Sequence, residues 1–147
     1  MGNLNELYQE VILDHNQNPR NYKKLEACSH VADGHNPLCG DQLTLYLNIK
    51  NDIIEDVSFT GSGCAISTAT ASIMTTILKG QTIISAIELF NIAHELITTG
   101  QSKKEAPAKL MVLSGVHKYP VRVKCASLSW HTMKNALEER TKVTKTE

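Results

Sequence analysis

The sequence has no excess of charge of either sign, since 15 lysines and arginines match 15 aspartates and glutamates. Nucleic acids and anionic membranes attract proteins through a positive field that this balance does not provide, so we expect neither as a partner. The sequence also has no run of 18 apolar residues, which excludes a membrane-spanning helix. The polar, acidic first ten residues show no secretory signal, and we therefore expect a cytoplasmic location.

Internal repeats, low-complexity linkers and breaks in composition are absent as well. We therefore expect a single domain over residues 1–147, with a frayed polar tail from about Thr141. A chain of this length buries a hydrophobic core without disulfides. Cysteine is scarce, with four residues at Cys28, Cys39, Cys64 and Cys125. In a reducing compartment, metal binding or thiol chemistry is a better interpretation of these cysteines than disulfide pairing.

Hydrophobic periodicity predicts an α+β fold, with a small antiparallel β-sheet packed against several α-helices. Alternating apolar residues predict two strands, residues 43–50 and 53–60, joined by the turn residues Asn51-Asp52 into a hairpin. Residues 20–38 look irregular or weakly extended. Helical spacing of apolar residues predicts helices over residues 4–16, 64–79, 82–98 and 125–140.

Three of the cysteines lie at positions that favour thiolate chemistry. Cys39 precedes a glycine on a predicted turn, whereas Cys64 and Cys125 lie at predicted helix starts. A helix N-terminus carries partial positive charge and unpaired N–H groups, which stabilise a thiolate over a thiol. Gly40 and Gly63, beside the first two cysteines, would allow a metal or a partner's sulfur to approach the backbone.

Asp41 adds a carboxylate to these thiols. It follows Cys39 by two residues, and side chains two apart in a strand project to the same side. One carboxylate and three thiolates would complete a four-coordinate site with soft ligands, which suits zinc or an iron–sulfur centre. The spacing alone leaves another interpretation open, because no C-x-x-C pair is present and buried cysteines commonly serve as small hydrophobes.

Three ordered motifs, Asn36–Asp41, Gly61–Ser67 and Arg122–Trp130, resemble those of the U-type iron–sulfur cluster assembly proteins, and short N-terminal segments match as well. The similarity is closest to the SufU branch, because 60 residues separate Cys64 from Cys125 and Lys124 stands where the IscU branch has histidine. A protonated lysine has no lone pair for a metal, so Lys124 is not a ligand. The matching segments are Asn36-Pro37-Leu38-Cys39-Gly40-Asp41, Gly61-Ser62-Gly63-Cys64-Ala65-Ile66-Ser67, Arg122-Val123-Lys124-Cys125-Ala126-Ser127-Leu128-Ser129-Trp130, Leu7-Tyr8, Asp14-His15 and Asn18-Pro19-Arg20.

This resemblance implies a SufE/IscU-like fold and a zinc-dependent sulfurtransferase. Such a protein accepts persulfide sulfur from a cysteine desulfurase of the SufS type and passes it to a downstream iron–sulfur scaffold. The resemblance further implies that one zinc ion per chain is held by Cys39, Asp41, Cys64 and Cys125, and that Cys39 accepts the sulfur. Arg122, three residues before Cys125, is our candidate for the desulfurase contact, with an ordinary surface charge as the alternative.

Other functions remain open at this point. The same ligands would suit a scaffold that assembles a [2Fe–2S] cluster, or a non-catalytic module with structural zinc. A cysteine hydrolase fits poorly, because no histidine base is paired with a cysteine. Cys28 lies outside the motifs and is interpreted as a structural or surface thiol, although it would give a four-cysteine site in place of Asp41. We interpret His35 as a turn residue and Trp130 as a core residue.

Overall fold

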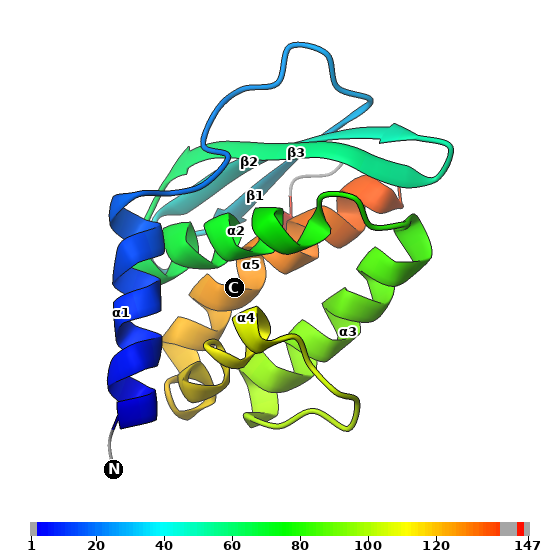
Figure 1. Cartoon of the computed structure of the whole chain (residues 1–147). Helices are drawn as coiled ribbons and strands as arrows, with labels where there is room; N and C mark the ends of the chain where they lie inside the picture. The colour runs from blue at the N-terminus through cyan, green and yellow to red at the C-terminus, as the bar shows by residue number, and fades with distance from the viewer. Residues whose placement is uncertain (1–2, 139–143, 146–147) are drawn as a thin grey trace.

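The computed structural model describes residues 3–138 and 144–145, in which one face of a four-stranded sheet is covered by helices (Figure 1). This arrangement confirms the predicted α+β class. No helix among the described residues has the length and apolar character needed to cross a membrane. In chain order the elements are α1 (Asn3–Gln17), β1 (His30–Asn36), β2 (Asp41–Lys50), β3 (Ile53–Ser62), α2 (Ala65–Leu78), α3 (Ile83–Thr99), α4 (Ala108–Met111), the 3-10 helix η1 (Ser114–Lys118), α5 (Pro120–Leu137) and β4 (Thr144–Lys145).

The sheet has the strand order β3-β2-β1-β4, with β1, β2 and β3 antiparallel and β4 parallel to β1. The predicted hairpin is confirmed as β2 and β3. Its turn residues Asn51 and Asp52 have φ angles of 52° and 62°, the left-handed conformation that a tight hairpin turn requires. Leu45 and Leu47 of β2 are fully buried against the helices, which fixes the register of the sheet on its core.

Strand β1 lies within residues 20–38, so the expectation of irregular or weakly extended chain was wrong for His30–Asn36. The buried positions of β1 are Ala32, Gly34 and Asn36. The sequence therefore lacks the alternation of large apolar residues that indicates a strand. A Cβ atom at Gly34 would overlap the Thr132 hydroxyl of α5. The small residues thus allow the β1 backbone to pack directly on α5.

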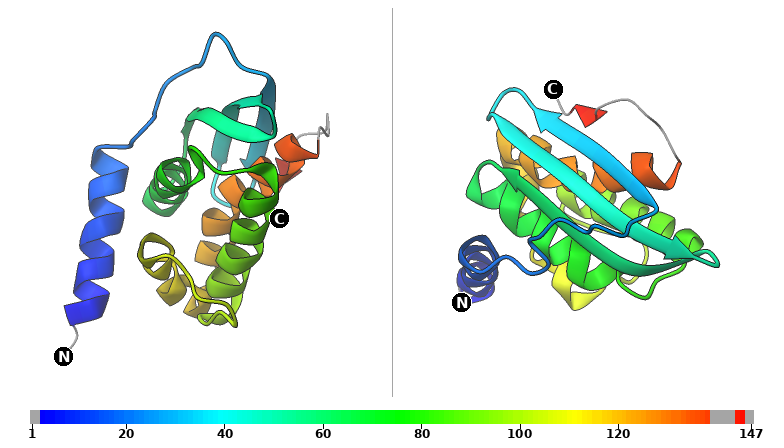
Figure 2. Two further views of the ribbon diagram at one scale, coloured as in Figure 1. Left: turned by 45° about the vertical axis from the view of Figure 1, so that its right-hand side comes forward. Right: turned by 90° about the horizontal axis from the view of Figure 1, so that it is seen from above.

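Helices α2 and α5 lie under the sheet, and α3 packs against α5 on the far side (Figure 1). Helix α1 agrees with the predicted helix over residues 4–16 and stands at the side of the body, packed on α2 (Figure 2). Its end is anchored to Ser72 of α2, whose hydroxyl lies 2.7 Å from His15 Nδ1 and accepts the Arg20 N–H at 2.8 Å.

Helix α5 begins at Pro120, five residues earlier than the predicted start at Cys125. Proline suits the first helical position, because its missing N–H would have no partner there. Trp130 is 1 % exposed, which confirms it as a core residue. The helix ends at Leu137, whereas the prediction extended to residue 140, which lies outside the described residues. The predicted frayed tail from Thr141 also lies mostly outside them, apart from the two residues of β4.

Candidate metal centre

Four predicted ligand residues converge at one end of the sheet from three parts of the fold. Cys39 lies on the turn between β1 and β2, and Asp41 is the first residue of β2. Cys64 is the N-cap of α2, directly after β3, and Cys125 lies in the second turn of α5. The β1–β2 turn and the two helices therefore bring together residues that are up to 86 positions apart in the chain.

The distances between the candidate ligand atoms fit a single metal ion. The Sγ atoms of Cys39 and Cys125 are 3.4 Å apart, and with an Asp41 carboxylate oxygen all three ligand atoms lie within 4.8 Å of one another. The Cys64 Sγ atom lies 3.9 Å from Asp41 Oδ2. Tetrahedral zinc with Zn–S bonds of about 2.3 Å places neighbouring sulfurs about 3.8 Å apart. Cys39, Asp41 and Cys125 are therefore close enough to hold one metal ion, whereas Cys64 lies outside this group of mutually close atoms and borders it through Asp41.

The carboxylate of Asp41 is the fixed part of this group. Asp41 is fully buried, and its carboxylate accepts the Cys64 N–H at 2.8 Å and an N–H of the Asn36 amide at 3.2 Å. A Cβ atom at Gly63 would lie only 2.5 Å from Asp41 Oδ1. The missing side chain at Gly63 thus leaves room for the Asp41 carboxylate, and the expected approach of a metal or a partner's sulfur to this glycine stays a prediction.

Cys39 is the accessible thiol of the group. It is exposed, whereas Cys125 is 2 % exposed and Cys64 is partly buried. The turn that carries Cys39 is closed by a hydrogen bond from its N–H to the Asn36 carbonyl at 3.3 Å. Gly40 follows with a φ of 70°, a left-handed conformation that other residues adopt at a cost. This turn leaves Cys39 exposed to solvent.

The other two thiols differ in their electrostatic surroundings. Cys64 lies at the helix start as predicted, and its Sγ accepts the Ser67 N–H at 3.4 Å. Cys125 does not lie at a helix start, so the predicted stabilisation of its thiolate by the helix terminus is wrong. Burial instead raises the pKa of the Cys125 thiol, and hydrogen bonding with the thiols of Cys39 and Cys64 raises it further. Its surroundings therefore favour the thiol form of Cys125 over the thiolate.

Sequence reasoning missed the part played by Asn36. This residue is fully buried, and its Nδ2 lies 3.2 Å from Asp41 Oδ2 and 3.5 Å from Cys125 Sγ. Its position opposite Asp41 in the ladder of β1 and β2 was not visible while β1 itself was unrecognised.

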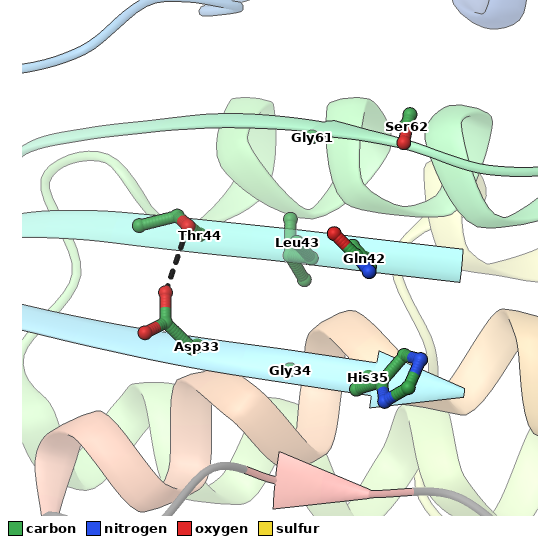
Figure 3. A pocket seen from close by; sticks show the side chains of 8 residues that line it. All are labelled: Asp33, Gly34, His35, Gln42, Leu43, Thr44, Gly61 and Ser62. Atoms are coloured by element: carbon green, nitrogen blue, oxygen red, sulfur yellow. Dashed lines mark hydrogen bonds between the residues drawn. The ribbon is translucent and has the colours of Figure 1, made fainter. Parts of the chain in front are cut away.

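The remaining candidates lie apart from the metal centre. Cys28 lies in the segment before β1, and no contact joins it to Cys39, Asp41 or Cys125 among the described residues, whereas Cys64 contacts Asp41. His35 belongs to β1 rather than to a turn, and its side chain lies on the outer face of the sheet beside Gln42 (Figure 3). Both line a depression of about 340 Å³ on that face. Arg122 is exposed, with its guanidinium carbon 4.5 Å from the centre of the Tyr119 ring.

Comparisons with known proteins agree with this architecture. Residues 7–139 match the family model of the NifU-like N terminal domain. The zinc-dependent sulfurtransferase SufU of Bacillus subtilis (strain 168) is 40% identical over 137 residues, which cover 92% of each chain. The iron–sulfur cluster assembly scaffold protein IscU of Streptococcus pyogenes serotype M1 is 34% identical over 139 residues, covering 94% of this chain and 87% of its own.

A solved structure extends the comparison to three dimensions. The crystal structure of an iron–sulfur cluster assembly scaffold protein for the SUF system from Fervidobacterium islandicum AW-1 superposes with a TM-score of 0.80 at 34% identity. The superposition covers 90% of this chain and 97% of the other. Fold and sequence therefore agree over nearly the whole length.

Proposed function

The chain belongs to the family of NifU-like N-terminal domains, and on that premise we propose that it is an iron–sulfur cluster assembly protein. Within that role it acts as a zinc-dependent acceptor of persulfide sulfur from a cysteine desulfurase. One observation carries this proposal: three thiols and a buried carboxylate from distant parts of the chain converge, and one thiol is exposed. The similarity to a zinc-dependent sulfurtransferase supports the choice of metal and reaction.

We assign the zinc ligands as Cys39, Asp41, Cys64 and Cys125. Zinc, when bound, would hold the thiolates deprotonated and join the β1–β2 turn to α2 and α5. Asp41 is the ligand with the most restricted position, since Cys64 and Asn36 both donate to its carboxylate. A fixed carboxylate keeps the site assembled while a more exposed ligand reacts.

Cys39 is the residue that takes the sulfur. Its thiolate attacks the outer sulfur of the partner's cysteine persulfide, a new S–S bond forms on Cys39, and the S–S bond of the partner breaks. The partner's cysteine leaves as a thiolate, so charge and sulfur both balance. Cys125 is too deeply buried to meet a sulfur carried by another protein, and Cys64 faces its own helix terminus.

The surface around Cys39 is suited to protein docking. Leu38, Tyr119 and Val121 are 62%, 50% and 55% exposed, and Val121 lies one helical turn before Cys125. Arg122 extends over the Tyr119 ring, and arginine and tyrosine are enriched at the energetic centres of interfaces. We place the desulfurase, of the SufS type, on this surface. A downstream iron–sulfur scaffold then receives the sulfur.

A scaffold function is the second candidate, because the relative from Streptococcus pyogenes is named as one and thiolates also suit a [2Fe–2S] cluster. Metal content separates the two: a zinc protein is colourless and contains one zinc per chain, whereas a cluster is brown. Lys124, which has no lone pair when protonated, reduces the number of ligands available for a cluster.

Persulfide labelling after a single turnover with a cysteine desulfurase tests the proposal. We expect mass spectrometry to locate the added sulfur on Cys39, and the Cys39→Ala variant to abolish stimulation of the desulfurase. Cys28→Ala serves as the matched control and should behave as the parent. Label on Cys28 alone, or full stimulation by Cys39→Ala, would refute the assignment of the acceptor.

A further inference from the structure

We infer that Asn36 is a positioning residue of the metal centre, which holds Asp41 and Cys125 in place and leaves Cys39 as the most reactive thiolate. This inference rests on the proposed function, because it assigns a role to a residue that is not itself a ligand. It concerns the contacts that surround the ligands, which commonly orient them and tune their reactivity.

The side-chain amide of Asn36 joins two ligands from different elements. Asn36 is the last residue of β1 and pairs with Asp41 across the ladder. Its Nδ2 lies 3.2 Å from Asp41 Oδ2 and 3.5 Å from Cys125 Sγ of α5. The orientation of the amide follows from its neighbours, because the reverse orientation would turn its oxygen toward two acceptors.

The other end of the same amide has no partner. Asn36 Oδ1 is buried and accepts no hydrogen bond from any residue that the structure describes. A buried amide oxygen without a donor destabilises the folded state. An apolar residue of similar size would therefore give a more stable protein, unless the N–H groups of the amide make contacts that are needed. The contacts of Nδ2 with Asp41 and Cys125 supply that use.

The hydrogen bonds to the three thiols differ in a way that points to Cys39. Cys125 Sγ receives an N–H of Asn36, and Cys64 Sγ receives the N–H of Ser67. Within residues 3–138, Cys39 Sγ accepts only from the Cys125 thiol, at 3.4 Å. An N–H donor draws electron density from a thiolate and lowers its nucleophilicity. Cys39 is thus the thiolate that attacks, on chemical as well as steric grounds.

Zinc affinity of Asn36→Leu, measured by competition with a chromophoric chelator, tests this role. Leucine has a similar volume and no donor, and we expect the zinc dissociation constant to rise about 10–100-fold, as for other residues that support metal ligands. The absorption of the cobalt-loaded variant should shift in its sulfur-to-cobalt band. Ser58→Ala is the control, because Ser58 is likewise fully buried with an unpartnered oxygen but lies on β3.

A double-mutant cycle separates positioning from a general structural role. In an Asp41→Ala background the effect of Asn36→Leu on zinc affinity should shrink, because the two side chains act on the metal together. An undiminished effect in that background, or parental zinc affinity in Asn36→Leu, would overturn the inference. Should Asn36→Leu fail to fold, Asn36→Ser decides in its place, since serine is too short to reach either ligand.

Failure of the proposed function would be recognised separately. If Cys64→Ser and Cys125→Ser both retain zinc at parental affinity, the metal site itself is wrong and the role of Asn36 falls with it. If these variants lose zinc while Asn36→Leu keeps it, only the role of Asn36 is refuted.

Discussion

Replacing Gly63 with alanine perturbs the metal centre without replacing any of the proposed ligands. The added Cβ would lie 2.5 Å from Asp41 Oδ1, whereas ordinary contacts begin at 3.4 Å. The Asp41 carboxylate would have to move by about 0.9 Å within a close-packed site. That movement strains or breaks its hydrogen bond with the Cys64 N–H, now 2.8 Å long.

The size of the effect follows from these two terms. Overpacking of a close-packed site costs about 1–3 kcal/mol, and loss of a hydrogen bond to a charged group costs about 1.5–3 kcal/mol. The two costs do not simply add, because a movement of the carboxylate relieves the overpacking but breaks the hydrogen bond. We therefore expect Gly63→Ala to lower the free energy of unfolding by about 2–4 kcal/mol. Zinc affinity should fall as well, because Asp41 leaves its position.

Gly40→Ala is the matched control on the other side of the site. Gly40 has a left-handed φ of 70°, but a Cβ there would meet no atom within 4 Å. Its replacement costs backbone strain of about 1–2 kcal/mol and leaves the carboxylate in place. Urea unfolding of the metal-free proteins and chelator competition measure both quantities. Equal destabilisation by the two variants, with equal zinc affinity, would refute the packing argument for Gly63.

Three further predictions concern the ligands, the docking surface and pH. Cys64→Ser and Cys125→Ser should each lose zinc and unfold at lower temperature, whereas Cys28→Ser should keep parental zinc content; zinc loss in Cys28→Ser would show a wrong ligand set. Arg122→Ala should weaken desulfurase binding in a titration while zinc content stays unchanged, and equal affinity would place docking elsewhere. Burial lowers the pKa of His131, so the unfolded chain takes up this proton first and stability falls as pH drops below about 7. His131→Phe should reduce that fall in urea unfolding at pH 5.5 against pH 7.5, and an unchanged slope would exclude His131 as its source.

The sequence predicted the elements whose local signals are strong. The hairpin of β2 and β3 follows from alternating leucines and the Asn51-Asp52 turn, and the start of α2 follows from the glycines before Cys64. The convergence of Cys39, Asp41 and Cys125 was expected from the motif resemblance. Spacing alone did not establish it, since Cys125 is 86 positions away from Cys39 in the chain.

The features that were missed depend on contacts between distant elements. Strand β1 packs on α5 at Gly34, where the lack of a side chain lets the two backbones approach. A glycine gives no hydrophobic signal in the sequence, so this contact could not be predicted. The early start of α5 at Pro120 moved Cys125 from a helix terminus into the core, which reverses the direction expected for its pKa. The roles of Asn36 and Gly63 likewise depend on their contacts with the Asp41 carboxylate, which only the three-dimensional structure shows.

The most direct test of the account is X-ray absorption at the zinc edge of the purified, zinc-loaded protein. The four ligands proposed here predict three sulfur atoms at about 2.3 Å and one oxygen at about 2.0–2.2 Å, with the sulfur count falling to two in Cys125→Ser. Four sulfurs, which would bring in Cys28, or a nitrogen in the shell, which would bring in a histidine, would contradict it.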